Sequence, residues 1–185
     1  MKIEKFDYND IEELLANTYV ISDKDKNAIV IDPSKDNDGV INYLEKHDLI
    51  LKAILLTHGH FDHMRGVNRL VNKYHVPLYI HYEDEENLKD SYLNCSDMGD
   101  EKIIVEQTPI LIKDGDELNI LSEGLIKVIH TPFHTKGSVC YYLKDNKSTN
   151  HTYINERQLE DGEEVLLKNN AKFRLGDETF LFKMG

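Results

Sequence analysis

Three histidines and an aspartate lie within six residues, in the segment His58-Gly-His60-Phe-Asp62-His63. Imidazole and carboxylate groups are ligands that zinc and similar divalent metals prefer. His58 and His60 can turn toward one ion and Asp62 and His63 toward a neighbouring position, so one loop could furnish most of two adjacent sites. A bound metal lowers the pKa of water to about 7, and the predicted chemistry is attack by a metal-bound hydroxide on a polarised carbonyl or phosphoryl centre.

The alternative is a chance collection of surface histidines on a flexible loop, which the compact spacing directly after an apolar run opposes. A further candidate ligand is His134, in the segment His130-Thr-Pro-Phe-His134. It follows another strand-like run and could supply the third ligand of the first site. Three protein ligands are enough for a catalytic zinc that keeps one coordination position open.

Metal ligands must be held in place by rigid secondary structure, and the residues before and after the cluster predict strands and a helix that can do so. Residues 50–56 form a nearly continuous apolar run, typical of a strand buried on both faces, and this strand leads directly into the cluster. A helix is expected over residues 64–74 and a second strand over residues 76–81. The result is a strand, helix, strand unit with parallel strands, and catalytic groups commonly follow the ends of such strands.

The flanking segments predict two sheets. Residues 18–22 and 28–33 read as a hairpin around a polar turn, and residues 36–48 as a helix that begins at Asp36 or Asn37. A short helix and a surface loop are expected over residues 82–107. From residue 110 onward, four strand-like pieces predict a second sheet; they cover residues 110–113, 117–120, 125–130 and 138–143.

Together these segments resemble the metallo-β-lactamase superfamily, and within it the hydroxyacylglutathione hydrolases (glyoxalase II) and their small bacterial relatives. The motifs that carry the resemblance are Asn17-Thr-Tyr, Ala28-Ile-Val-Ile-Asp32-Pro, Leu55-Leu-Thr-His-Gly-His-Phe-Asp-His63, Lys113-Asp-Gly-Asp116 and His130-Thr-Pro-Phe-His134. The resemblance implies a first metal site of His58, His60 and His134. It implies a second site that includes Asp62 and His63, and a further role for Asp62 in moving protons.

Some residues depart from the family pattern. Phe133 stands where the family commonly has glycine, which could tilt the loop that carries His134. The remaining histidines match no ligand position and are expected to be surface or structural residues: His47, His75, His81, His130 and His151.

The resemblance stops near residue 146. The family continues with a strand ending in a Gly-Asp pair, whose aspartate bridges the two metals, and with a later histidine; neither occurs at the expected place. Gly176-Asp177 echoes the pair, but Asp177 lies much farther from His134 than the family's aspartate, so a role as a substitute bridge is disfavoured.

The tail resembles the C-terminal half of a forkhead-associated (FHA) domain, through Ser148-Thr-Asn-His-Thr-Tyr-Ile-Asn155 and Arg174-Leu-Gly-Asp177. His151 replaces the usual glycine, and the upstream phosphothreonine-binding residues of that family are not found. We therefore predict an α/β fold with two parts. Residues 1–146 form a metallo-β-lactamase-type αββα sandwich that is incomplete at its C-terminal half, and residues 147–185 form an all-β FHA-like segment, which could close the second sheet.

The composition narrows the kinds of molecule that the chain is expected to bind. Among 185 residues, 40% are apolar and 30% charged, a balance typical of folded globular chains. The formal net charge of −12 opposes binding to nucleic acid, because such binding depends on Lys and Arg displacing counterions. No apolar run reaches the length of about 20 residues that spans a bilayer, so no membrane contact is expected. Two isolated cysteines and the lack of an apolar leader favour a reducing cytoplasm.

Two functions compete. The first is a metal-dependent hydrolase of thioesters or related esters that acts on a small molecule with one or two ions of zinc, iron or manganese. The second is a non-catalytic or impaired fusion protein that binds a protein partner through the FHA-like tail. The lack of a bridging aspartate favours the second function, and the lack of phosphopeptide-binding residues opposes it. The oligomeric state, the substrate and the origin of the fusion stay open.

Overall fold

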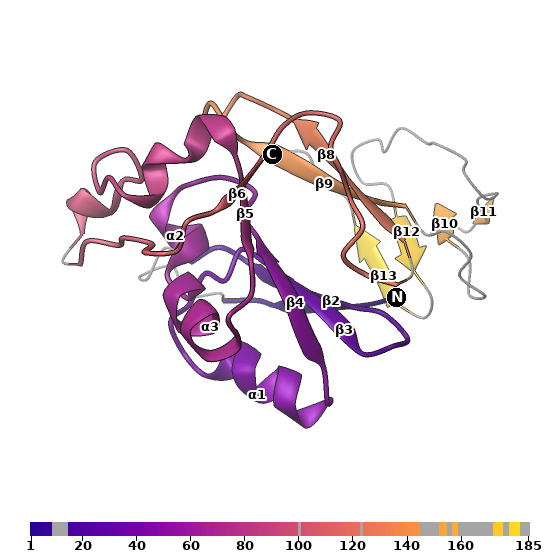
Figure 1. Cartoon of the computed structure of the whole chain (residues 1–185). Helices are drawn as coiled ribbons and strands as arrows, with labels where there is room; N and C mark the ends of the chain where they lie inside the picture. The colour runs from indigo at the N-terminus through magenta and orange to yellow at the C-terminus, as the bar shows by residue number, and fades with distance from the viewer. Residues whose placement is uncertain are drawn as a thin grey trace.

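The computed structural model describes residues 1–8, 15–99, 101–122 and 124–144, together with residues 152–154, 157–158, 172–175 and 178–181 of the tail. A six-stranded sheet lies at the centre, in the order β1-β2-β3-β4-β5-β6. Helices cover one of its faces, and a three-stranded sheet, β7-β8-β9, packs against the other (Figure 1). Over the described residues the layers are therefore helix, sheet and sheet.

The large sheet begins antiparallel and continues parallel. Its strands are β1 (Lys2–Phe6), β2 (Thr18–Ser22), β3 (Asn27–Ile31), β4 (Ile50–Leu55), β5 (Leu78–His81) and β6 (Ile110–Ile112). The predicted hairpin of β2 and β3 and the predicted parallel pairing of β4 with β5 are both confirmed. The expectation for residues 110–113 was wrong in one respect, because β6 pairs with β5 in the first sheet and not in the second. β1 was not predicted.

Successive residues of the central strands point to opposite faces, as the strand period of two requires. In β3, Ala28 and Val30 pack in the cluster between sheet and helices, while Ile29 and Ile31 pack in the cluster between the two sheets. All four are buried. A strand that is buried on both faces must be apolar throughout, which is why these strands read as continuous apolar runs.

The helices are α1 (Gly39–Lys46), α2 (Phe61–Met64) and α3 (Val67–Tyr74). The expected N-cap of α1 was wrong: Asp38 occupies it, and the Asn37 side chain accepts a hydrogen bond from the Gly39 amide instead. The single helix expected over residues 64–74 is two helices, which are separated at Gly66. The Gly66 amide donates to the Pro33 carbonyl at 2.8 Å, and a Cβ atom there would lie 2.7 Å from the Lys35 carbonyl oxygen. Close backbone approach therefore breaks the helix directly after the histidine cluster.

The second sheet contains β7 (Glu117–Leu118), β8 (Leu125–His130) and β9 (Val139–Lys144), all antiparallel. Two contacts fasten β9 to the end of β4. The Tyr141 hydroxyl donates to the Leu56 carbonyl at 2.8 Å, and the Val139 amide donates to the Thr57 carbonyl at 2.8 Å. Between β5 and β6 the chain forms three single 3₁₀ turns at Tyr82–Asp84, Glu86–Leu88 and Ser96–Met98, in place of the expected short helix.

The described strands of the tail are β10 (Thr152–Ile154), β11 (Arg157–Gln158), β12 (Lys172–Leu175) and β13 (Glu178–Leu181). They form an antiparallel sheet of their own, in the order β11-β10-β12-β13, and do not extend the second sheet as anticipated. The rest of the predicted all-β segment, including residues 159–171, lies outside the described residues.

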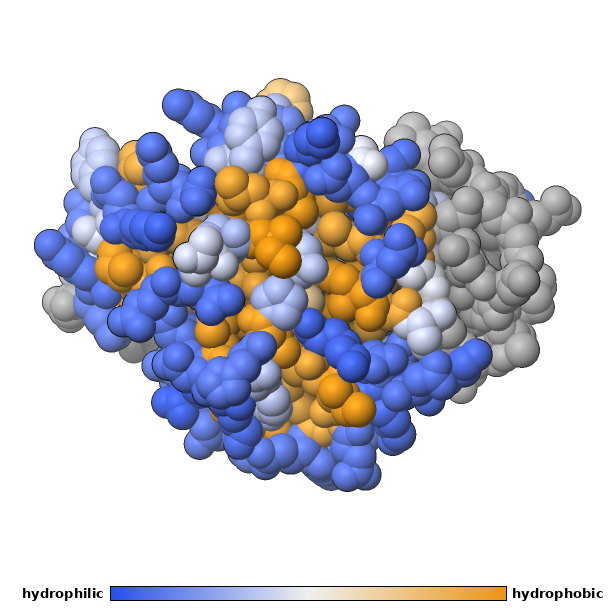
Figure 2. Space-filling model, viewed as in Figure 1, coloured by the Kyte–Doolittle hydropathy of each residue, from blue (hydrophilic) through white to orange (hydrophobic). Residues whose placement is uncertain are grey.

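Apolar side chains gather in the middle of the face shown in Figure 2, over the edge of the large sheet that β5 and β6 form. β6 is the last strand of that sheet, and its Ile110 and Leu111 are 47% and 44% exposed. Within the described part of the chain, no helix is long and apolar enough to cross a membrane.

Candidate metal centre

The site lies at the carboxyl ends of three neighbouring parallel strands. Asp32 directly follows β3, the loop from Thr57 to His60 follows β4, and Asp84 lies in the turn after β5. Because parallel strands end at the same edge of a sheet, these three segments meet there. His134 joins them from the loop between β8 and β9 in the second sheet.

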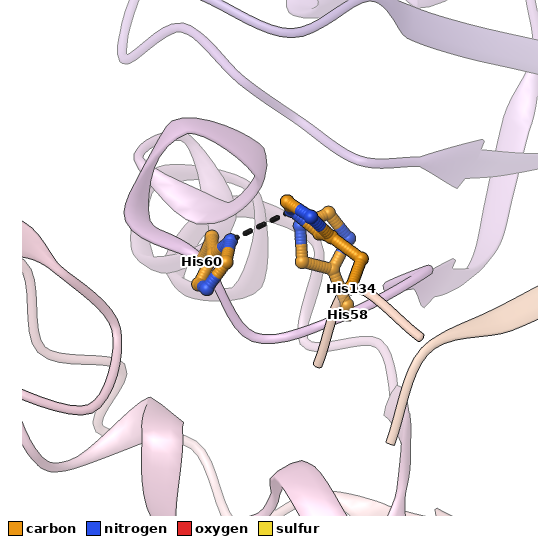
Figure 3. A group of neighbouring side chains, drawn as sticks. All are labelled: His58, His60 and His134. Atoms are coloured by element: carbon orange, nitrogen blue, oxygen red, sulfur yellow. Dashed lines mark hydrogen bonds between the residues drawn. The ribbon is translucent and has the colours of Figure 1, made fainter. Parts of the chain in front are cut away.

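His58, His60 and His134 face one another around one point (Figure 3). One ring nitrogen from each lies within 4.8 Å of the others. Nδ1 of His60 is 3.0 Å from Nε2 of His134, and the ring centroids of His58 are 4.8 Å and 4.7 Å from those of His60 and His134. The structure therefore brings together the three residues predicted for the first site, although 74 positions separate His60 from His134.

A chain of hydrogen bonds sets which nitrogen of His58 is free. The Thr57 hydroxyl donates to Oδ2 of Asp32 at 2.7 Å, so its oxygen can accept a hydrogen bond from Nδ1 of His58 at 3.1 Å. With its proton on Nδ1, His58 presents an unprotonated Nε2. That atom is buried and has no hydrogen-bond partner among the described residues. An unpartnered buried nitrogen that faces two other imidazoles fits a metal ligand, since such an atom is otherwise costly.

The electrostatics keep the imidazoles of His58 and His60 neutral. Burial, together with the neighbouring His63, His60 and His134, lowers the pKa of His58 to about 2. Burial and His134 also lower the pKa of His60. A neutral imidazole is the form that binds a metal, so these two residues are held in the state that binds a metal.

Asp62 and His63 lie beside the three histidines and face one another. Nε2 of His63 is 3.5 Å from Oδ2 of Asp62, and Nδ1 of His63 is 2.9 Å from Oδ2 of Asp32. Burial alone would lower the pKa of His63, but the hydrogen bond and charge of Asp32, with the charge of Asp62, outweigh it and raise the pKa. Among the described residues, this pair is not part of a group of three or more metal-binding side chains. Within the described part of the chain, the second position therefore has the donors Asp62 and His63 and no third.

Asp84 is a buried carboxylate beside the site that the sequence did not single out. Its carboxylate is 1% exposed and accepts hydrogen bonds from the Gly59 amide at 3.0 Å, the Gly137 amide at 2.8 Å and the Thr135 hydroxyl at 2.6 Å. Asp32 was quoted only as part of a motif, yet it contacts both Thr57 and His63. One feature of the sequence could have identified both Asp32 and Asp84: each is an aspartate that follows a buried strand, at the end of the strands where the histidine cluster lies.

His81, Glu83 and His130 form a second cluster of metal-binding types. The rings of His81 and His130 are stacked, with centroids 4.1 Å apart and planes at 16°, and Nε2 of His130 lies 2.7 Å from the Lys136 carbonyl oxygen. A nitrogen that donates to a carbonyl cannot also bind a metal, and lone pairs in nearly parallel rings do not converge. The cluster fastens the base of the His134 loop, so the expectation that His81 and His130 are structural agrees with this geometry.

The other histidines lie away from the centre or outside the description. His75 is exposed and ends α3 in a left-handed conformation, and His47 ends α1. His151 and Asp177 lie outside the described residues.

A depression of about 450 Å³ opens beside the three histidines, a volume within the range of small-molecule sites. His60 and His134 form part of its wall, and the apolar side chains of Leu93 and Phe133 line it with Lys136. Phe133 is 95% exposed. The glycine-to-phenylalanine departure from the family pattern therefore places an aromatic ring at this depression.

Residues 11–148 match the Metallo-beta-lactamase superfamily. The chain belongs to this superfamily. It is 35% identical over 132 residues to the probable metallo-hydrolase YqgX of Bacillus subtilis. That alignment covers 70% of this chain and 61% of YqgX. The chain is 36% identical over 138 residues to hydroxyacylglutathione hydrolase 1 of Vibrio vulnificus, in an alignment that covers 73% of this chain and 47% of that protein. The crystal structure of BLEG-1 B3 metallo-beta-lactamase matches with a TM-score of 0.68 at 31% identity, over 77% of this chain and 67% of that chain.

The chain spans less than two thirds of the length of these two curated relatives. The superfamily match ends at residue 148, so it supports the metallo-β-lactamase prediction for the first part and gives no support to the FHA resemblance of the tail.

Proposed function

We propose that the chain is a metal-dependent hydrolase of thioesters or related esters, of the glyoxalase II type. One observation carries the proposal: three imidazoles, of which burial keeps those of His58 and His60 neutral, meet at one point beside a depression large enough for a small molecule. Nε2 of His58, Nδ1 of His60 and Nε2 of His134 are the atoms that would hold the ion. The similarity to hydroxyacylglutathione hydrolase 1 supports the substrate class.

A bound zinc or iron ion would supply Lewis acidity and a water molecule with a pKa near 7. The side chains of the chain supply the rest. His58 is held in one tautomer through Thr57 and Asp32, and the carboxylate of Asp62 is placed to accept and return a proton. The depression orients the substrate and limits its contact with water.

We propose zinc, iron or manganese as the metal, with one ion held firmly. Imidazole ligands suit zinc and iron, and a carboxylate suits manganese. A second ion would rest on Asp62 and His63, with two donors among the described residues. Occupancy of the second position is therefore expected to be weaker than that of the first.

Metal content and turnover, measured together, test the proposal. The purified protein should hold at least one equivalent of zinc, iron or manganese and hydrolyse a hydroxyacylglutathione thioester above background. His60→Ala should reduce metal content, whereas His75→Ala, a change at the exposed C-cap of α3, should leave it unaltered. Less than one equivalent of metal with no turnover would remove the enzyme proposal, and equal loss in both variants would show the ligand assignment to be wrong.

A second candidate is a binding module with an impaired metal site. The observation that favours it is the separate antiparallel sheet of the tail, which pairs with itself and not with the second sheet. In this proposal residues 1–146 and 147–185 are two units, and the FHA-like unit binds a protein partner. Limited proteolysis would cut near residue 146, and a phosphothreonine peptide would bind the intact protein. No cleavage there and no peptide binding would leave only the first candidate.

We also propose that the protein works in a reducing cytoplasm without nucleic acid. Cys95 and Cys140 are both free thiols, and the net charge of −12 repels phosphate backbones. Cell fractionation tests the location, and a DNA-binding titration at low salt tests the partner. Recovery of the protein outside the cytoplasm would contradict the proposed location. Salt-dependent binding to DNA would contradict the proposal that nucleic acid is not a partner.

A further inference from the structure

We infer that Asp84 is the positioning residue that holds the two metal-binding loops in register. This inference rests on the proposed metal site and concerns what aligns it. The first loop carries His58 and His60, and the second carries His134. The two come from different sheets, so something must keep their imidazoles on one point.

The Asp84 carboxylate bonds to both loops at once. Oδ2 accepts from the Gly59 amide at 3.0 Å and from the Thr135 hydroxyl at 2.6 Å, and Oδ1 accepts from the Gly137 amide at 2.8 Å. Gly59 lies between the two ligands of the first loop, and Thr135 directly follows the ligand of the second. A shift at either contact therefore moves a ligand with it.

The second loop is fully engaged around this carboxylate. Oγ of Ser138 lies 2.7 Å from the Thr135 hydroxyl oxygen and accepts a hydrogen bond from the Thr135 amide at 2.9 Å. The Thr135 hydroxyl can therefore donate to Asp84 while Ser138 donates to Thr135. Hydrogen bonds to a charged acceptor are roughly twice as strong as those between neutral groups, which suits a carboxylate at this position better than an amide.

The two glycines let the loops come close enough. A Cβ atom on Gly137 would lie 2.7 Å from Cγ of Asp84 and 2.8 Å from its backbone nitrogen. A Cβ atom on Gly59 would lie 2.5 Å from Cβ of Asn87, three residues beyond Asp84. The second loop thus lies against the turn that carries Asp84 and the first against the turn that follows it, and neither glycine can carry a side chain without a shift of its neighbours.

A matched residue separates this role from general stability. Asp23 is another buried aspartate, 6% exposed, and its carboxylate accepts from the Asn27 amide at 2.9 Å and the Ser122 amide at 2.7 Å. It lies at the turn before β3, whereas Asp32 and the metal centre lie after the end of that strand. Asp23→Asn therefore removes a comparable buried carboxylate at the opposite end of the strands from the metal centre.

The test compares zinc binding to the metal-free wild type, Asp84→Asn and Asp23→Asn, by competition with a coloured chelator. Asp84→Asn should weaken zinc binding by roughly 10- to 100-fold, the loss typical when groups behind metal ligands are changed. The visible spectrum of bound cobalt should change, and Asp23→Asn should match the wild type in both. Thr135→Val, which removes one contact, should weaken zinc binding in the same direction by less and serves if Asp84→Asn does not fold.

Hydrogen exchange of the Gly59 and Gly137 amides in the metal-free protein gives a readout that needs no metal. Both amides should exchange faster in Asp84→Asn and remain protected in Asp23→Asn. Unchanged zinc affinity with unchanged exchange in Asp84→Asn would overturn the inference, as would an equal loss of affinity in Asp23→Asn. If the wild type bound no zinc, iron or manganese, the proposed function would fail, and amide exchange alone would decide the role of Asp84.

Discussion

The buried, neutral His58 makes a quantitative prediction for the metal-free protein. Its folded-state pKa is about 2, whereas an unfolded histidine titrates near 6.5. Between these values the unfolded chain binds a proton that the folded protein does not, so acid favours unfolding. Stability from this group is present above about pH 6.5 and is lost as pH falls toward the folded pKa, with a slope of about 1.4 kcal/mol per pH unit. His58 is 6% exposed, so solvent screening is small.

Linkage over this window predicts that His58 alone reduces the free energy of unfolding by about 2 kcal/mol between about pH 7 and about pH 5. The measurement is urea denaturation with a chelator present, on the wild type and on His58→Asn, which cannot titrate there. Carboxylates and the other histidines titrate in both proteins, so the difference between the two curves isolates His58. The wild type should lose stability more steeply on acidification.

Parallel curves for the two proteins would refute the reasoning, because they would show that His58 is not buried in its neutral form. A wild type that became relatively more stable in acid would refute it as well.

Three further changes have defined outcomes. Asp32→Asn removes the partner that raises the pKa of His63, so the stability that this pair adds below about pH 6.5 should disappear in metal-free protein, as measured by urea denaturation across pH. Gly66→Ala places a methyl group 2.7 Å from the Lys35 carbonyl and should lower the melting temperature, with a destabilisation of about 1–3 kcal/mol. Phe133→Gly removes a ring that is 95% exposed, so the melting temperature should hold while the KM for a thioester rises.

The cluster and its support could be predicted from the sequence because their signals are local. His58 and His60 lie in the loop that directly follows an apolar strand, and a strand buried on both faces is evident from its composition alone. Asp62 and His63, expected in the same loop, lie in the short helix α2 that follows it. The hairpin and the parallel pairing of β4 with β5 followed from the same patterns. His134 required the family resemblance, because nothing local links a histidine to partners about 74 residues away.

The errors fall where contacts between distant segments decide the outcome. The helix after the cluster breaks at Gly66 because the backbone at Pro33 comes close to it. β6 belongs to the first sheet because it pairs with β5, the strand at which that sheet would otherwise end. Neither cause can be seen in a window of neighbouring residues. The tail strands pair with one another for the same reason, since pairing depends on which edges meet in space.

The sequence by itself determined the residue types of the metal centre and the strand that leads into it, since ligand chemistry and apolar periodicity are local properties. Only the tertiary structure decided which nitrogen of each imidazole faces the centre, and that buried carboxylates stand behind them. In the sequence, Asp32 belongs to a motif with no contact assigned to it, and Asp84 is one of several neighbouring acidic residues. They acquire their roles because parallel strands end at one edge of the sheet and bring their carboxylates against loops that are distant along the chain.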